Sequence, residues 1–194
     1  MKTGLLIVDI QNDYFPGGNM ELVGMDAAAQ QASDLLTKFR DSGLPVYHVQ
    51  HLSIRPGATF FLPDTPGAEI HEAVRPNKGE QLIQKHFPNA FRETELSEVV
   101  KRDAIEHLVI CGAMSHMCID ATTRAAFDLR FKCTVIENAC ATRDLSFHAE
   151  KVLAKDVHAA FMAALSVPYA NVVTVQDYMK HRSETETNRK TDAV

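Results

Sequence analysis

The chain has 194 residues, of which 45% are hydrophobic, and its formal net charge is −5. This length and composition can bury one sizeable core and favour one domain rather than two. No run of about 18 apolar residues occurs, which argues against a transmembrane helix, and the scattered lysines and arginines do not suggest a nucleic-acid-binding surface.

The N-terminal region and the cysteines indicate the compartment. The first apolar run, from Leu5 to Val8, is too short for a signal peptide, and Asp9 interrupts it. None of the four cysteines, at positions 111, 118, 133 and 140, belongs to a C-x-x-C pair, so neither a zinc ribbon nor a thioredoxin motif is indicated. We therefore expect a cytoplasmic protein with free thiols.

The first half of the chain predicts strands separated by a helix and a long loop. Residues 5–10 and 45–49 read as buried strands, and apolar positions at helical spacing predict a helix over 26–42. A proline-rich irregular stretch follows over 51–80. A loop of this length inside a compact domain is usually functional.

The second half continues the alternation of strands and helices. Strands are expected at 81–85, 105–111, 133–137 and 171–175. Helices are expected from Thr94 onward, with Leu96, Val99 and Val100 facing inward, and over 115–130 and 146–165. Ser115 is the expected N-cap of its helix. In the helix over 146–165, one face carries Leu153, Val157, Phe161 and Ala164. Residues 1–182 are expected to form the domain, and the polar tail 183–194 is expected to be disordered.

The alternation of strands and helices predicts the fold class. Strands that are apolar throughout are typical of a parallel sheet covered by helices on both faces. We therefore expect an α/β protein with three layers, α-β-α, and a Rossmann-like arrangement. In such sheets the active site lies beyond the carboxyl ends of the strands.

Three reactive residues lie at predicted strand ends. Asp9 follows the first strand, Lys85 ends the strand 81–85, and Cys118 lies in the first turn of the helix after the strand 105–111. A helix N-terminus and a nearby ammonium both favour a thiolate, and a carboxylate can accept the thiol proton. The set could therefore perform covalent acyl transfer, with helix N–H groups as an oxyanion hole.

Each of these residues also has a purely structural interpretation. Asp9 could be a turn residue, and Lys85 a solvated surface lysine. Cys118 could pack inward as a small core residue, together with Thr122, Ala125, Ala126 and Leu129. The pattern alone does not decide between the two interpretations.

Three sequence blocks resemble those of the isochorismatase-like cysteine hydrolase superfamily, which includes nicotinamidases and N-carbamoylsarcosine amidohydrolases. The blocks are residues 6–15, 85–96 and 109–118, with further similarity over 122–126 and 138–144. The resemblance runs from residue 4 to about residue 178.

The resemblance implies a six-stranded, mainly parallel sheet and a catalytic triad of Asp9, Lys85 and Cys118. It also implies a cis peptide between Ala113 and Met114, and an oxyanion site formed by the backbone amides of Met114 and Cys118. It implies a small-molecule substrate, no organic cofactor, and a homodimer or larger homo-oligomer.

Two departures from the family pattern narrow the activity. Family nicotinamidases carry an Asp-x-His metal motif where this chain has Val49-Gln50-His51, so no metal is expected, with a site at His51 and His71 as a weaker alternative. Family isochorismatases tend to lack the cysteine. Retention of Cys118 favours attack on a carbonyl carbon, and thus hydrolysis of a C–N bond in an amide, carbamoyl or ureido group.

Other residues are candidate substrate contacts, and two further functions stay open. The candidate contacts are Gln11, Phe15, Phe60, Phe87, Phe91 and His116. One alternative is a vinyl-ether hydrolase of the isochorismatase type that uses Asp9 as general acid, and the other is a non-enzymatic binding protein. The stretch 51–80 could be a lid or a subunit contact.

Overall fold

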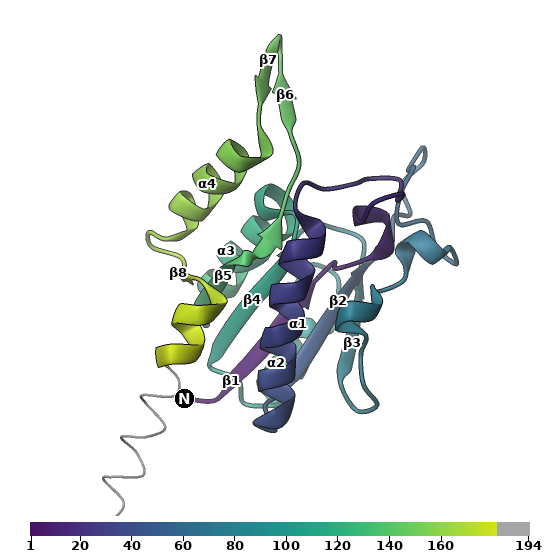
Figure 1. The fold of residues 1–194 in the computed structure, drawn as a ribbon. Coiled ribbons are helices and arrows are strands. Elements are labelled where there is room, and N and C mark those ends of the chain that lie inside the picture. The colour runs from purple at the N-terminus through teal and green to yellow at the C-terminus, as the bar shows by residue number, and fades with distance from the viewer. Residues whose placement is uncertain (182–194) are drawn as a thin grey trace, which may run out of the picture.

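The computed structural model describes residues 1–181, and a six-stranded parallel sheet forms its centre (Figure 1). The strand order is β3-β2-β1-β4-β5-β8, and every neighbouring pair is parallel. The strands are β1 (Thr3–Val8), β2 (Val46–His51), β3 (Gln81–Lys85), β4 (His107–Ala113), β5 (Lys132–Ala141) and β8 (Asn171–Val173). The predicted fold class is confirmed.

Helices cover both faces of the sheet. The named helices are α1 (Met25–Asp41), α2 (Leu96–Arg102), α3 (Asp120–Asp128) and α4 (Ala154–Leu165), and residues 175–181 are also helical. Short helical turns are η1 (Asn12–Tyr14), η2 (Pro66–Ala68), η3 (Glu72–Val74) and the π-helical η4 (Ser115–Ile119). No helix within residues 1–181 is both long and apolar enough to cross a membrane. The predicted tail 183–194 lies outside the described residues.

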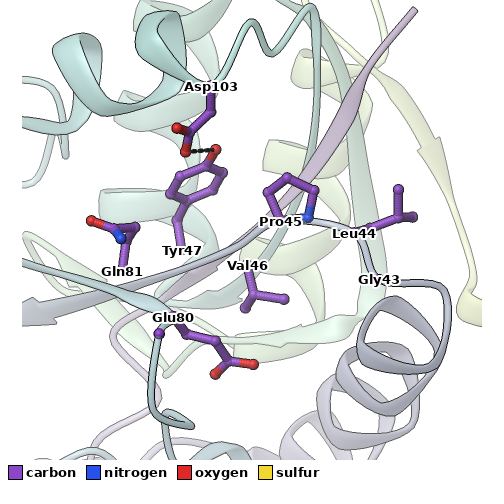
Figure 2. A pocket seen from close by; sticks show the side chains of 9 residues that line it. Gly43, Leu44, Pro45, Val46, Tyr47, Glu80, Gln81 and Asp103 are labelled. Carbon is purple, nitrogen blue, oxygen red and sulfur yellow. Dashed lines mark hydrogen bonds between the residues drawn. The ribbon is translucent and has the colours of Figure 1, made fainter.

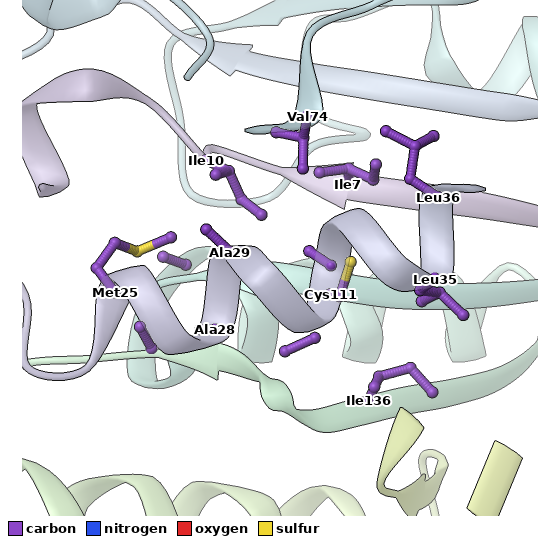
Figure 3. Close-up of a cluster of buried hydrophobic side chains, with 14 of the residues drawn as sticks. Ile7, Ile10, Met25, Ala28, Ala29, Leu35, Leu36, Val74, Cys111 and Ile136 are labelled. Atoms are coloured by element: carbon purple, nitrogen blue, oxygen red, sulfur yellow. The ribbon is translucent and has the colours of Figure 1, made fainter. Parts of the chain in front are cut away.

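Two apolar clusters hold the layers together. On one face, α1 packs Ala28, Leu35 and neighbouring residues against Ile7 of β1 and Cys111 of β4 (Figure 3). On the other face, α2, α3 and α4 enclose a second cluster around Leu108. Apolar side chains alternate between the faces of each strand, so a strand buried on both sides supplies both clusters.

The predicted helix over 146–165 is wrong in its first part. Residues 145–152 form an antiparallel hairpin of β6 (Leu145–Phe147) and β7 (Glu150–Val152), which projects from the body (Figure 1). Phe147 is 70% exposed, so the hairpin has no apolar face against the core. The helix begins at Ala154, where Asp144 accepts the backbone N–H at 2.7 Å.

The buried face of α4 also differs from the prediction. Its buried residues are Ala154, Val157, Met162 and Leu165. Leu153 and Ala164 are exposed, and Phe161 is half-buried. The face of α4 that packs against the rest of the protein is therefore rotated from the predicted one.

Candidate active site

Lys85 connects the reactive residues of the site. Its Nζ lies 2.7 Å from Asp9 Oδ2 and donates a hydrogen bond to Cys118 Sγ at 3.2 Å. A third contact, at 2.9 Å, joins Nζ to Nδ1 of His51. The ammonium group therefore forms an ion pair with Asp9 and contacts both Cys118 and His51. The predicted residues Asp9, Lys85 and Cys118 therefore lie together.

The sheet explains this convergence. Asp9 directly follows β1, and its backbone φ of 53° ends the strand in a left-handed conformation that aspartate tolerates. His51 and Lys85 are register partners at the ends of β2 and β3. All three residues therefore lie at the carboxyl edge of adjacent parallel strands.

Cys118 comes from the turn that follows β4. The peptide bond between Ala113 and Met114 is cis. Residues 115–119 then form η4, which leads directly into α3. Ser115 is not the N-cap that we expected, because the N-cap is Met114 and makes no side-chain capping bond. The Ser115 hydroxyl instead lies 2.9 Å from His158 Nδ1 of α4.

Close backbone packing fixes the strand that carries this turn. Gly112 lies opposite Val8 in the sheet register and has a φ of 125°. A Cβ atom at this position would overlap the carbonyl oxygen of Val8. Only glycine allows β4 to approach the end of β1 this closely.

Burial controls the protonation of the site. Burial and then the charge of Asp9 raise the pKa of Cys118, and Lys85 only partly opposes them. Burial disfavours the charged form of Lys85, but Asp9 and Cys118 outweigh it and raise the pKa of Lys85. At rest the site therefore holds a protonated thiol beside a charged ammonium.

His51 is a neutral member of the site. Burial and the positive charge of Lys85 lower its pKa to about 4. Lys85 can only donate, so Nδ1 of His51 must be the acceptor and the ring proton must lie on Nε2. The sequence placed His51 only in a metal hypothesis, because the register between β2 and β3 is not a local property.

Tyr14 is a site residue that the sequence analysis missed. Its side chain is 2% exposed, and burial, followed by Cys118 and Asp9, raises its pKa. The hydroxyl has no hydrogen-bond partner among residues 1–181, yet it is not sealed from solvent. Phe60 contacts its ring, with centroids 6.1 Å apart. Tyr14 therefore lies within electrostatic range of the reactive groups, with Phe60 against its ring.

Gln11 joins the segments around the site. Its amide nitrogen donates to the carbonyl oxygens of His51 and Ala68, at 2.9 and 2.7 Å. Its amide oxygen accepts the backbone N–H of His51 at 2.7 Å. The side chain is completely buried, and its hydrogen bonds connect the ends of β1, β2 and η2.

The stretch between β2 and β3 is fastened over the loop that follows β1. The Asp13 carboxylate accepts the N–H of Phe61 at 2.6 Å, and Asn12 donates to Pro66 at 2.8 Å. Phe15 stacks on His71 with ring centroids 3.6 Å apart. The structure thus makes this stretch a cover packed against residues 10–15.

The remaining predicted contacts are engaged with other side chains. The Arg92 guanidinium lies 3.6 Å from the ring centroid of Phe87, and Phe91 stacks on Phe131. His116 Nδ1 lies 2.6 Å from the Thr142 hydroxyl. His116 is two residues from Cys118, and Phe91 packs against the apolar cluster that contains Cys118.

One group of potential metal ligands occurs within residues 1–181. Asp9, His51 and Cys118 offer ligand atoms that all lie within 4.8 Å of one another. The Lys85 ammonium already contacts all three, so a cationic group is in place among them. His71 is not in this group, and its Nδ1 accepts the N–H of Ala73.

A separate hollow of about 220 Å³ lies at the opposite edge of the sheet (Figure 2). Its lining includes Val46 and Tyr47 at the start of β2 and Gln81 at the start of β3. Tyr47 donates a hydrogen bond to Asp103 at 2.8 Å. The hollow therefore belongs to the amino ends of the strands and not to the candidate site.

Known proteins resemble the chain over most of its length. Residues 3–177 match the isochorismatase domain. The uncharacterized isochorismatase family protein YddQ of Bacillus subtilis (strain 168) is 50% identical over 93% of this chain and 100% of its own length. Maleamate amidohydrolase of Pseudomonas putida is 28% identical over 92% of this chain and 86% of its own.

The solved structures agree with this similarity. A crystal structure from Oleispira antarctica, assigned to the isochorismatase hydrolases, is 52% identical and superposes with a TM-score of 0.89. The match covers 92% of this chain and 96% of the other.

Proposed function

The chain belongs to the isochorismatase family of hydrolases, and on that premise we propose that it cleaves a C–N bond of a small molecule through a thioester on Cys118. The scissile group is an amide, a carbamoyl or a ureido group. Asp9 acts as general acid and base, and Lys85 orients Asp9 and the sulfur.

The observation that carries this proposal is the set of contacts at Lys85. One ammonium group touches both the Asp9 carboxylate, at 2.7 Å, and the Cys118 sulfur, at 3.2 Å. A nucleophile and a proton acceptor held by one cation are the elements that acyl transfer requires. Lys85 keeps its proton because Asp9 and Cys118 raise its pKa.

Acylation is the first half of the proposed cycle. Because the thiol is protonated at rest, Asp9 takes its proton as the sulfur attacks the substrate carbonyl carbon. The oxyanion is bound by the backbone amides of Met114 and Cys118. As the C–N bond breaks, Asp9 returns the proton to the nitrogen, and ammonia or an amine leaves.

Deacylation completes the cycle. Asp9 takes a proton from a water molecule, whose oxygen attacks the thioester carbon. The carbon–sulfur bond breaks, the acid leaves, and the sulfur regains a proton. Asp9 and Lys85 end each turnover in their starting charge states.

Two features favour C–N hydrolysis over vinyl-ether hydrolysis. Protonation of a vinyl ether needs an acid but no nucleophile, whereas here a cysteine lies in contact with the ammonium that pairs with Asp9. The similar maleamate amidohydrolase of Pseudomonas putida is an amidohydrolase by name. We also propose a cytoplasmic location, and the family resemblance supports a homodimer or larger homo-oligomer.

The direct test is ammonia release from a panel of amides, carbamoyl and ureido compounds. Cys118→Ala should lower turnover by a factor of at least about 10³, because it removes the nucleophile. The matched control is Cys133→Ala, which removes another buried thiol, on β5, and should stay active. A thioester trapped on Cys118 should appear in the intact mass.

Two outcomes would contradict the thioester route. Full amide hydrolysis by Cys118→Ala would show that the sulfur does not take part. If the unaltered protein and Cys118→Ala both hydrolyse a vinyl ether, and neither releases ammonia from any amide, the result would favour a vinyl-ether hydrolase in which Asp9 acts as general acid.

A further inference from the structure

We propose that His51 is a further catalytic residue, whose Nε2–H binds and orients the water molecule that hydrolyses the thioester, while its Nδ1 positions Lys85. The inference rests on the proposed function, because it assigns His51 a role in the deacylation half of that cycle.

The backbone of His51 is fixed at the carboxyl edge of the sheet. The Gln11 amide oxygen accepts the N–H of His51 at 2.7 Å, and the Gln11 amide nitrogen donates to the His51 carbonyl oxygen at 2.9 Å. His51 is also the register partner of Lys85 at the ends of β2 and β3. One completely buried side-chain amide thus holds both backbone polar groups of His51, so the support of the ring is in place before a substrate binds.

The contact with Lys85 fixes the tautomer of His51. Nζ of Lys85 lies 2.9 Å from Nδ1 and can only donate, so Nδ1 is the acceptor and Nε2 carries the ring proton. The structure gives Nε2 no hydrogen-bond partner within residues 1–181, and it does not seal this atom from solvent. The ring therefore keeps one unused N–H donor beside the reactive groups.

The spacing of the reactive groups suits a bound water molecule. A ring nitrogen of His51, a carboxylate oxygen of Asp9 and the sulfur of Cys118 lie within 4.8 Å of one another. A water molecule that hydrogen-bonds two groups bridges a gap of roughly 4.5–5.5 Å. In the proposed cycle the hydrolytic water must contact Asp9 and reach the carbon bound to the sulfur. The imidazole is therefore within reach of that water.

His51 can serve as a donor while Asp9 remains the base. Burial and the positive charge of Lys85 lower the pKa of His51 to about 4, so the ring stays neutral at neutral pH. In deacylation Asp9 takes one proton from the water as its oxygen attacks the thioester carbon. Nε2 keeps its own proton and donates a hydrogen bond to that oxygen. The carbon–sulfur bond then breaks, and the sulfur receives the proton that Asp9 holds.

Two substitutions of similar shape separate the roles of the two ring nitrogens. Asparagine can place its amide oxygen where Nδ1 lies, so His51→Asn keeps an acceptor for Lys85 and loses the Nε2–H. Leucine has a similar branched shape without a polar atom, so His51→Leu loses both. His86→Asn is the control, because His86 is exposed, directly follows Lys85 and has its Nδ1 2.8 Å from the Leu52 carbonyl oxygen.

Deacylation is measured with the best amide of the substrate panel. In His51→Asn, kcat should fall about tenfold, as expected for one lost hydrogen bond to the reacting water. Ammonia release should show a burst of about one equivalent, and the thioester on Cys118 should accumulate in the intact mass. Hydroxylamine should restore turnover, because its nitrogen attacks the thioester carbon and releases a hydroxamate without the oriented water. His86→Asn should behave as the unaltered protein.

The position of Lys85 is measured separately, by alkylation of Cys118 with iodoacetamide, in which the sulfur displaces iodide. Lys85 favours the thiolate, so a displaced ammonium should slow this reaction. His51→Leu should react about threefold more slowly than the unaltered protein, whereas His51→Asn should react at the unaltered rate. Urea unfolding of each variant checks that the fold is intact, and peptide mass identifies the modified cysteine.

The outcomes separate the role of His51 from the proposed function. If His51→Asn accumulates no thioester, or if hydroxylamine does not restore its turnover, the role in deacylation is overturned and the thioester route stands. Equal alkylation rates in His51→Leu and the unaltered protein would overturn the positioning of Lys85. If Cys118→Ala retains full turnover, the proposed function fails, and the role of His51 in deacylation fails with it.

Discussion

At the scale of single residues, the resting thiol of Cys118 differs from the sequence-based prediction. We expected the helix N-terminus and Lys85 to lower its pKa. Lys85 does act in that direction, but the net shift is upward. The side chain is 5% exposed, and burial together with Asp9 raises the pKa. Desolvation of the charged form outweighs a single neighbouring cation. Free thiolate is therefore scarce at rest, and the proposed mechanism requires Asp9 to take the thiol proton when a substrate binds.

Asp9→Asn should therefore make Cys118 more reactive and the enzyme less active. The substitution removes a negative charge that raises the pKa of Cys118, while Lys85 still favours the thiolate. Alkylation by iodoacetamide at pH 8 should become about tenfold faster, since the thiolate fraction rises tenfold for each unit of pKa. Ammonia release should be lost, because the general base is gone.

Both effects are checked by measuring the rate of alkylation and the rate of ammonia release in the same samples of Asp9→Asn and of the unaltered protein. Slower alkylation in Asp9→Asn would mean that Asp9 activates the sulfur even at rest, contrary to the raised pKa.

At the scale of elements, η4 depends on its contact with α4. The Ser115 hydroxyl is completely buried, lies 2.9 Å from His158 Nδ1 and donates to the Ala141 carbonyl at 3.3 Å. His158 Nε2 lies 3.4 Å from Glu137 on β5. The Ser115 hydroxyl thus joins η4, which carries Cys118, to α4 and to the end of β5.

Ser115→Ala should destabilise the protein and loosen this turn. Loss of the hydroxyl leaves buried partners without a hydrogen bond, which costs about 1–3 kcal/mol of unfolding free energy. Urea unfolding measures this cost, and kcat for the best substrate should fall with it. Ser166→Ala is the control. The Ser166 hydroxyl donates a hydrogen bond to the Ala163 carbonyl at the exposed C-terminal end of α4. Equal effects of both substitutions would contradict a specific role for Ser115.

At the scale of the whole molecule, buried histidines tie stability to pH. His48 is completely buried with Nε2 2.8 Å from Glu80. Burial lowers its pKa, although Glu80 acts in the opposite direction. The unfolded chain therefore binds a proton at pH values where folded His48 does not. Stability should fall as pH drops below about 6.5, the ordinary pKa of histidine.

The slope for one such proton is about 1.4 kcal/mol per pH unit. His48→Asn should flatten the loss of unfolding free energy between pH 7 and pH 5, because asparagine does not titrate. The control His148→Asn changes an exposed histidine of the hairpin turn and should keep the slope of the unaltered protein. Urea unfolding at both pH values decides, and an unchanged slope in His48→Asn would refute the assignment.

Local patterns predicted the sheet better than they predicted the site. Apolar runs identified every strand of the main sheet, and the rule on strand ends brought Asp9, Lys85 and Cys118 together. The hairpin at 145–152 was missed because its residues are mostly exposed, so no core-facing pattern marks it. The contact of His51 with Lys85 depends on pairing between distant strands, which local sequence does not encode.

The position of Lys85 has a consequence for how such enzymes diversify. Under the proposed function Lys85 serves the reaction, and recognition of the substrate is left to residues in the surrounding loops, such as Tyr14 and Phe60. Substitutions there can redirect specificity while the bond-breaking apparatus stays intact. The reaction and the selectivity for substrates would thus depend on different residues. This separation is a favourable starting point for both natural divergence and laboratory evolution.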